Sequence, residues 1–231
     1  MDCKGQVRSL LRIAARLGHM SPEREWWLRV PGVLVRPRDV FLALRVNDPD
    51  DLDARQEPIL LLILLAGMSG VLLTSAWSDL LDPGAAGGAT LDVLTFVVLT
   101  FVAGALEGSA AYFFAGGALY LGARGMGSPG GWRVARQLLA FACVPLAVSV
   151  LATLPIGLAA FGGDLFRSGG ADSGTGGHIY LAYQLVFVAW SLGLLLVGIR
   201  TVYGWTWARS AGAFGLLVVF LAGLSAASNV V

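Results

Sequence analysis

Charged residues are scarce in this sequence. Asp, Glu, Lys and Arg make up 13% of its 231 residues, about half the share that is usual in a soluble domain. So few charges leave a folded soluble chain without enough polar surface, and they do not suit a disordered one. The net charge of only +1 also provides no basic face for nucleic acid. We therefore exclude an ordinary soluble enzyme, a disordered chain and a nucleic-acid binder.

Cysteine and histidine are nearly absent as well. The chain has two of each, Cys3, Cys143, His19 and His178, all far apart in the sequence. Such spacing provides neither a disulfide framework nor a metal site built from Cys and His. We accordingly expect no metal and no cofactor. Because no nucleophile and base converge in the sequence, we expect no catalytic residues and do not predict an enzyme.

Apolar residues are what the sequence has in excess, at 56% with a mean hydropathy of +0.73. Runs of about 20 apolar residues predict membrane-spanning helices. The predicted fold is an all-α polytopic membrane helical bundle with five transmembrane spans, at about residues 58–77, 92–122, 134–161, 179–199 and 210–229. Fifteen of the 16 basic residues are arginine, which is typical of GC-rich coding sequences and suggests a bacterial plasma (inner) membrane.

The second span raises a question of topology. As one helix, the apolar stretch 90–123 is about 51 Å long, whereas the hydrocarbon core measures about 30 Å. The charged residues between the first span and the second are all aspartates, and the loop that follows the second span carries arginines. A single crossing puts 15 of the 16 basic residues on the cytosolic side, and a double crossing removes this bias. We predict one long helix that protrudes or kinks near Gly104 and Gly108, a cytosolic N-terminus and a C-terminus outside.

The first 57 residues differ from the rest in charge. They carry ten basic and nine acidic residues, whereas residues 58–231 carry six of each. We predict a cytosolic or interfacial region over 1–57 and a membrane domain over 58–231. Basic residues recur every four positions at Lys4, Arg8, Arg12 and Arg16. This spacing indicates an amphipathic helix that either lies on anionic lipid or has a solvated basic face.

A second amphipathic helix is predicted over residues 37–46, with Val40, Phe41 and Leu44 on its apolar side. Tryptophan side chains suit the headgroup layer of a bilayer. We therefore expect three interface anchors near the polar ends of the predicted elements: Trp26, Trp27 and Trp77.

Glu107 is the most notable candidate residue because it lies inside an apolar run. A charge there costs roughly 2.5 to 3.5 kcal/mol. It could be a proton or cation site or form an interhelical hydrogen bond. Alternatively, it is a protonated glutamate or belongs to the protruding half of a long helix. The flanking Gly104 and Gly108 form a small-xxx-small pair that favours close helix packing.

Two prolines, Pro145 and Pro155, interrupt the third span. Each removes a backbone hydrogen bond and frees a carbonyl. A kink that shapes the bundle is favoured over an ion site built from these carbonyls. On the predicted inner surface we expect five basic residues to meet lipid headgroups or a partner: Arg124, Arg133, Arg136, Arg200 and Arg209.

Three segments resemble the Yip domain family, the Ypt-interacting proteins. Residues 119–145, LYLGARGMGSPGGWRVARQLLAFACVP, combine a Gly-rich loop, an aromatic residue, a basic helix start and a proline within the next span. Residues 190–209, WSLGLLLVGIRTVYGWTWAR, resemble the tryptophan-led span of the family, its short turn and the start of its last span. Pro37 followed by Val40-Phe41-Leu42 resembles the amphipathic segment before the first span. Together these matches cover roughly residues 30–229.

The resemblance implies a helical five-span domain with a cytosolic N-terminus. Eukaryotic members bind prenylated Rab-type GTPases and pair with related membrane proteins in vesicle transport. Those members carry an Asp-Leu-Tyr-Gly-Pro-like motif, and the nearest sequence here is Asp50-Asp51-Leu52-Asp53, so the motif gives no support for GTPase binding by this chain.

We therefore predict a non-enzymatic interaction or membrane-organising protein whose partners are the lipid bilayer and a second copy of itself or another membrane protein. The alternative is a small transporter or channel that uses Glu107 and the third span with its two prolines. The absence of an inverted repeat and the small number of intramembrane charges count against coupled transport.

Overall fold

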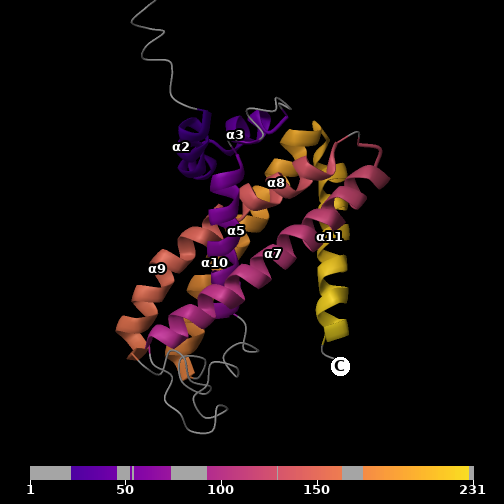
Figure 1. The fold of residues 1–231 in the computed structure, drawn as a ribbon. Helices are drawn as coiled ribbons and strands as arrows, with labels where there is room; N and C mark the ends of the chain where they lie inside the picture. Colours follow the sequence, from indigo (N-terminus) through magenta and orange to yellow (C-terminus); the bar gives the residue numbers. More distant parts are fainter. Residues whose placement is uncertain are drawn as a thin grey trace, which may run out of the picture.

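The computed structural model describes residues 22–45, 53, 55–73, 93–128, 130–162 and 174–228, and all regular structure in them is helical (Figure 1). The prediction of an all-α fold is confirmed. The helices are α2 (Pro22–Val35), α3 (Pro37–Ala43), α5 (Gln56–Leu73), α7 (Val93–Gly125), α8 (Trp132–Ala142), α9 (Val144–Phe161), α10 (Gly174–Tyr203) and α11 (Trp207–Ser228).

Three helical segments are long and apolar enough to cross a membrane: Val98–Gly125, Trp132–Phe161 and Gly174–Tyr203. Two shorter apolar helices, Gln56–Leu72 and Trp207–Val219, lie where the first and fifth spans are predicted. The chain thus has the helices of a multi-pass membrane protein. The count of five spans stays a prediction.

The stretch that posed the question of topology is one helix. α7 is continuous over 33 residues, and its helical structure passes through Gly104 and Gly108 without a break. Figure 1 shows that it crosses the neighbouring helices obliquely. A tilted helix can accommodate a length greater than the thickness of the bilayer, so this length does not require a second crossing.

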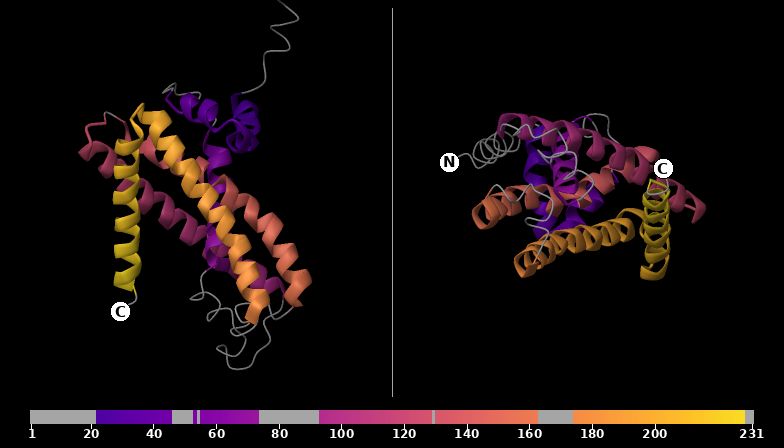
Figure 2. Two further views of the ribbon diagram at one scale, coloured as in Figure 1. Left: turned by 180° about the vertical axis from the view of Figure 1, so that it is seen from behind. Right: turned by 90° about the horizontal axis from the view of Figure 1, so that it is seen from below.

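Every arginine of the described residues belongs to a segment at one end of the bundle. At this end lie α2 and α3, the starts of α5, α8 and α11, and the ends of α7 and α10 (Figures 1 and 2). We call it the arginine end, after its eleven arginines: Arg24, Arg29, Arg36, Arg38, Arg45, Arg55, Arg124, Arg133, Arg136, Arg200 and Arg209. Glu107 is the only charged residue that lies well inside a long apolar helix in the described part of the chain.

The N-terminal helices α2 and α3 pack against the bundle at the arginine end. α3 buries Val40, Phe41 and Leu44, the residues that the sequence places on its apolar side. The ring of Phe41 lies against Gly198 of α10, so that a Cβ there would be 3.1 Å from Phe41 Cζ. Each such large apolar side chain contributes roughly 1.5 to 3 kcal/mol when fully buried. These helices therefore share one hydrophobic core with the membrane-spanning helices.

Candidate functional site

Three glycines bring α5 and α7 into backbone contact. A Cβ on Gly67 of α5 would overlap the carbonyl oxygen of Gly104 and lie 2.6 Å from the nitrogen of Gly108, both in α7. A Cβ on Gly104 would lie 2.7 Å from the nitrogen of Met68, and one on Gly108 would overlap the carbonyl oxygen of Ile63. Small residues allow this close approach of membrane helices. We call this contact the glycine interlock.

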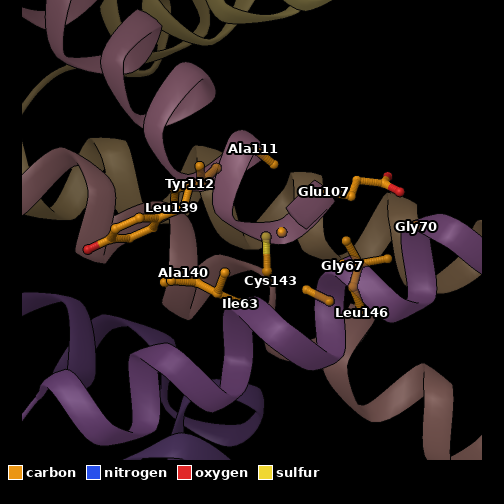
Figure 3. Close-up of a pocket in the computed structure, with 12 residues that line it drawn as sticks. Ile63, Gly67, Gly70, Glu107, Ala111, Tyr112, Leu139, Ala140, Cys143 and Leu146 are labelled. Atoms are coloured by element: carbon orange, nitrogen blue, oxygen red, sulfur yellow. The ribbon is translucent and has the colours of Figure 1, made fainter. Parts of the chain in front are cut away.

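Glu107 lies beside the glycine interlock. It lines a cavity of about 180 Å³ between α5, α7 and the α8–α9 region, together with Gly70, Cys143 and Leu146. Figure 3 shows its carboxylate on the side of Gly70, where a Cβ would be 3.0 Å from Glu107 Cδ. Glu107 is 14 residues from the start of α7, or about 21 Å along the helix. The structure thus places the Glu107 carboxyl group far from the start of α7 and in contact with α5.

The two prolines occupy different positions relative to this cavity. Pro145 lies in the first turn of α9, just after the chain leaves α8 at Cys143. Its neighbours Cys143 and Leu146 line the cavity, whereas Pro155, inside α9, is not among the lining residues. The structure therefore brings Glu107 close to the α8–α9 junction but does not gather Glu107 and both prolines into one site.

Polar side chains link α9 to its neighbours. The hydroxyls of Ser69 in α5 and Ser149 in α9 are 2.8 Å apart. The hydroxyl of Tyr180 in α10 donates to the carbonyl of Thr153 at 2.9 Å. Such hydrogen bonds hold helices together where water is absent, so Ser69 and Thr153 have structural partners.

Four of the five predicted inner-surface arginines stack on aromatic rings, three of them near the turns at the arginine end. The guanidinium carbon of Arg200 lies 4.3 Å from the Trp207 ring centroid, that of Arg209 4.9 Å from Trp205, and that of Arg124 5.9 Å from Tyr120. Arg209 also donates to the carbonyl of Met126. The last two of the five are in α8: Arg133 is exposed, and the side chain of Arg136 packs against α7, close to Gly116 and the Tyr112 ring.

The expected tryptophan anchors separate into different environments. Trp26 is 1% exposed and packs on Phe141 with ring centroids 5.5 Å apart. It cannot reach the headgroup layer, so the expected anchor is a core residue. Trp27 is 37% exposed, and its Nε1 donates to a carboxylate oxygen of Glu57 at 3.4 Å. Trp77 and the basic stripe from Lys4 to Arg16 lie outside the described residues.

Sequence reasoning missed Arg55. Its side chain is fully buried, donates to the carbonyls of Ala43 and Leu44 at the end of α3, and donates to Oε1 of Gln137 in α8 at 3.0 Å. Its guanidinium carbon lies 4.6 Å from the Trp26 ring centroid. In the sequence Arg55 is one more charge in a polar segment. Its closeness to the start of an apolar helix was the only available signal.

Comparison with known proteins gives one finding. The family model described as the Yip1 domain matches residues 32–228, from α2 to the end of α11. Neither the curated proteins nor the solved structures yield a match. The match spans most of the chain and confirms the resemblance that rests on the Gly-rich loop, the tryptophan-led span and the segment at Pro37.

Proposed function

The chain belongs to the Yip1 domain family and is a multi-pass integral membrane protein; on this premise we propose that it is non-enzymatic and organises the membrane by binding another membrane protein. The observation that carries the proposal is the exposed surface of α2 and α3. It combines large apolar side chains with basic ones. Leu28, Val35 and Leu42 are 55%, 79% and 48% exposed, next to the exposed Arg36 and Arg38.

Exposed apolar side chains bordered by polar residues are typical of interaction sites. α2 and α3 are fixed to the bundle by Trp26 and Phe41, so their outer surface is presented in one orientation. The arginines at this end support a cytosolic orientation by the positive-inside rule. We infer five spans, a cytosolic N-terminus and a C-terminus outside, in a bacterial plasma (inner) membrane.

The proposal predicts site-specific crosslinking. A photoreactive amino acid at Leu42 should crosslink to one membrane protein, a partner or a second copy, in native membranes. The same probe at Ile179, which is 65% exposed near the opposite end of the bundle, should give no discrete product. Because the basic residues contribute to recognition, Arg36→Glu with Arg38→Glu should reduce the Leu42 product by about fivefold or more. The yields are measured on immunoblots and the product is identified by mass spectrometry.

Glu107→Gln serves as a second control, because that residue lies far from this surface and should leave the Leu42 product unchanged. The proposal is wrong if Leu42 gives no product of defined mass. It is equally wrong if the reconstituted protein moves ions or solutes and Glu107→Gln abolishes the flux, since this result would establish transport.

The inferred topology predicts alternating accessibility of single cysteines. In a Cys3→Ser, Cys143→Ala background, an impermeant maleimide added to spheroplasts should label Gly84→Cys and Thr175→Cys. Gly131→Cys, where a Cβ meets no atom within 4 Å, should react only after permeabilisation. The topology fails if Gly84→Cys and Gly131→Cys are labelled from the same side, because α7 lies between them.

A further inference from the structure

A groove of about 460 Å³ runs along the surface between α5 and α7 and reaches the start of α8. Its volume is within the range of small-molecule sites. Along most of its length the walls are apolar, with Leu60 and Leu64 from α5 and Phe101 from α7, and at the arginine end they include Arg133 and Arg136 from α8. Leu60 and Phe101 are 66% and 51% exposed, so the groove opens toward the surrounding bilayer. We call it the α5–α7 groove.

Arg136 is held among aromatic rings at the head of this groove. Its guanidinium carbon lies 5.0 Å from the ring centroids of Tyr112 and Phe113 and 5.3 Å from that of Trp132. Stacking occupies the flat faces of a guanidinium and leaves the N–H groups at its edge for an acceptor. The rings therefore fix this cation in place without neutralising it.

The charge of Arg136 has no counterpart among the residues that the structure describes. None of their carboxylates forms an ion pair with it, and its buried Nε has no hydrogen-bond acceptor there. Buried donors are normally paired, so an unpaired one requires an explanation. Arg133 adds a second positive charge, and no Asp or Glu lines the groove. This end of the groove is therefore suited to an anion.

The length of the groove matches one leaflet of a bilayer. Phe101 and Phe113 both line it and are twelve residues apart on α7, which corresponds to about 18 Å. Half of the hydrocarbon core is about 15 Å thick. An occupant with an anionic group at the arginines and an apolar tail one leaflet deep would complement both parts of the wall.

We propose that the α5–α7 groove binds one acidic glycerophospholipid of the leaflet at the arginine end. The phosphate accepts hydrogen bonds from Arg133 and Arg136, and arginine is suited to bidentate contact with phosphate. One acyl chain lies along Leu64 and Phe101. The site goes beyond the membrane-organising function and does not depend on it, because bilayer lipid reaches the groove from its open side in either orientation of the protein.

Native mass spectrometry of the full chain in detergent tests whether Arg133 and Arg136 bind the lipid headgroup. Titration with dioleoylphosphatidylglycerol should show one tightly bound lipid, and dioleoylphosphatidylcholine should bind more weakly. Arg133→Gln with Arg136→Gln should weaken phosphatidylglycerol binding about 30-fold, since each basic residue near a membrane surface contributes on the order of a factor of five. Phosphatidylcholine binding should weaken much less, because the choline cation already offsets the charge of its phosphate. The matched control is Arg36→Gln with Arg38→Gln, which removes the same charge from the same end.

A second pair of variants tests the apolar part. Ala105 lines the groove and Ala110 is an exposed residue of α7 outside it. Ala105→Trp should fill the groove and abolish the tightly bound phosphatidylglycerol, whereas Ala110→Trp should retain it. If Arg136→Gln does not fold, Arg133→Gln alone should still weaken binding about fivefold, and the Ala105 pair remains informative.

Three results would each overturn the proposal. In the first, the control arginine pair weakens phosphatidylglycerol binding as much as the groove pair does, so that only the general charge of the arginine end attracts the lipid. In the second, phosphatidylglycerol binds no more tightly than phosphatidylcholine. In the third, Ala105→Trp leaves the tightly bound lipid in place.

Discussion

Replacing Gly67 with valine is expected to separate α5 from α7 and to destabilise the protein by roughly 3 kcal/mol or more, the upper part of the range for overpacking. The atoms that a Cβ at this position would meet are the backbone oxygen of Gly104 and the backbone nitrogen and Cα of Gly108. Backbone atoms of a helix cannot rotate away as a side chain can. The helices must therefore move apart along the most extensive helix pair of the fold.

The measurement is unfolding in mixed micelles, followed by circular dichroism as the fraction of denaturing detergent rises. Gly193→Val is a matched control, because Gly193 lies inside α10 and a Cβ there meets no atom within 4 Å. Since valine is more favourable than glycine inside a helix, the control should unfold at an equal or higher fraction of denaturing detergent. Equal stability of Gly67→Val and wild type would show that α5 and α7 do not meet as described.

The glycine interlock shows how much of the packing the sequence could predict. The spacing of Gly104 and Gly108 predicts a close-packed face on α7. It does not identify the helix that packs there, because Gly67 is one of 31 glycines spread over the chain. Contacts between distant segments depend on how the helices are arranged in space, which a local pattern does not specify.

The placement of charge was the most informative signal in the sequence. It predicts at which end of the bundle a charged residue lies, but not what surrounds its side chain. The alternation of loop charge predicts that arginines gather on one side, and the described arginines all lie at one end of the bundle. The same reasoning treats all arginines alike. It cannot distinguish the exposed Arg133 from Arg136, which lies between rings of α7 and α8, because tertiary packing rather than composition determines their surroundings.

The burial of Trp26 could not be predicted for a related reason. A tryptophan in a polar segment next to a membrane domain is typical of an interface anchor. Here α2 folds back onto the bundle, and the ring of Trp26 lies between Phe141 and the guanidinium groups of Arg29 and Arg55. Arg55, which covers part of this ring, has larger consequences of its own.

Replacing Arg55 with methionine is expected to destabilise the protein by on the order of 3 kcal/mol and to loosen α3. The last carbonyls of a helix have no partner within it, and Arg55 provides donors to two of them, those of Ala43 and Leu44, at 3.2 and 3.3 Å. It also donates to Gln137. Each buried acceptor that loses its donor costs about 1 to 3 kcal/mol. Methionine keeps most of the apolar length, so the loss reflects hydrogen bonds and charge more than volume.

Hydrogen exchange followed by mass spectrometry distinguishes this effect from a general loss of stability. In Arg55→Met the amides of α3 should exchange up to about 100-fold faster, because a segment held by fewer buried contacts opens more often, while those of α10 away from α3 should change less. Arg38→Met removes an exposed arginine of α3 itself and should leave both rates as in wild type. In Arg55→Lys the exchange rate of the α3 amides should fall between those of wild type and Arg55→Met. An ammonium keeps the charge but lacks the planar fork that reaches separate acceptors. Unchanged α3 exchange in Arg55→Met would mean that the apolar contacts of Phe41 and Leu44 alone hold α3 in place.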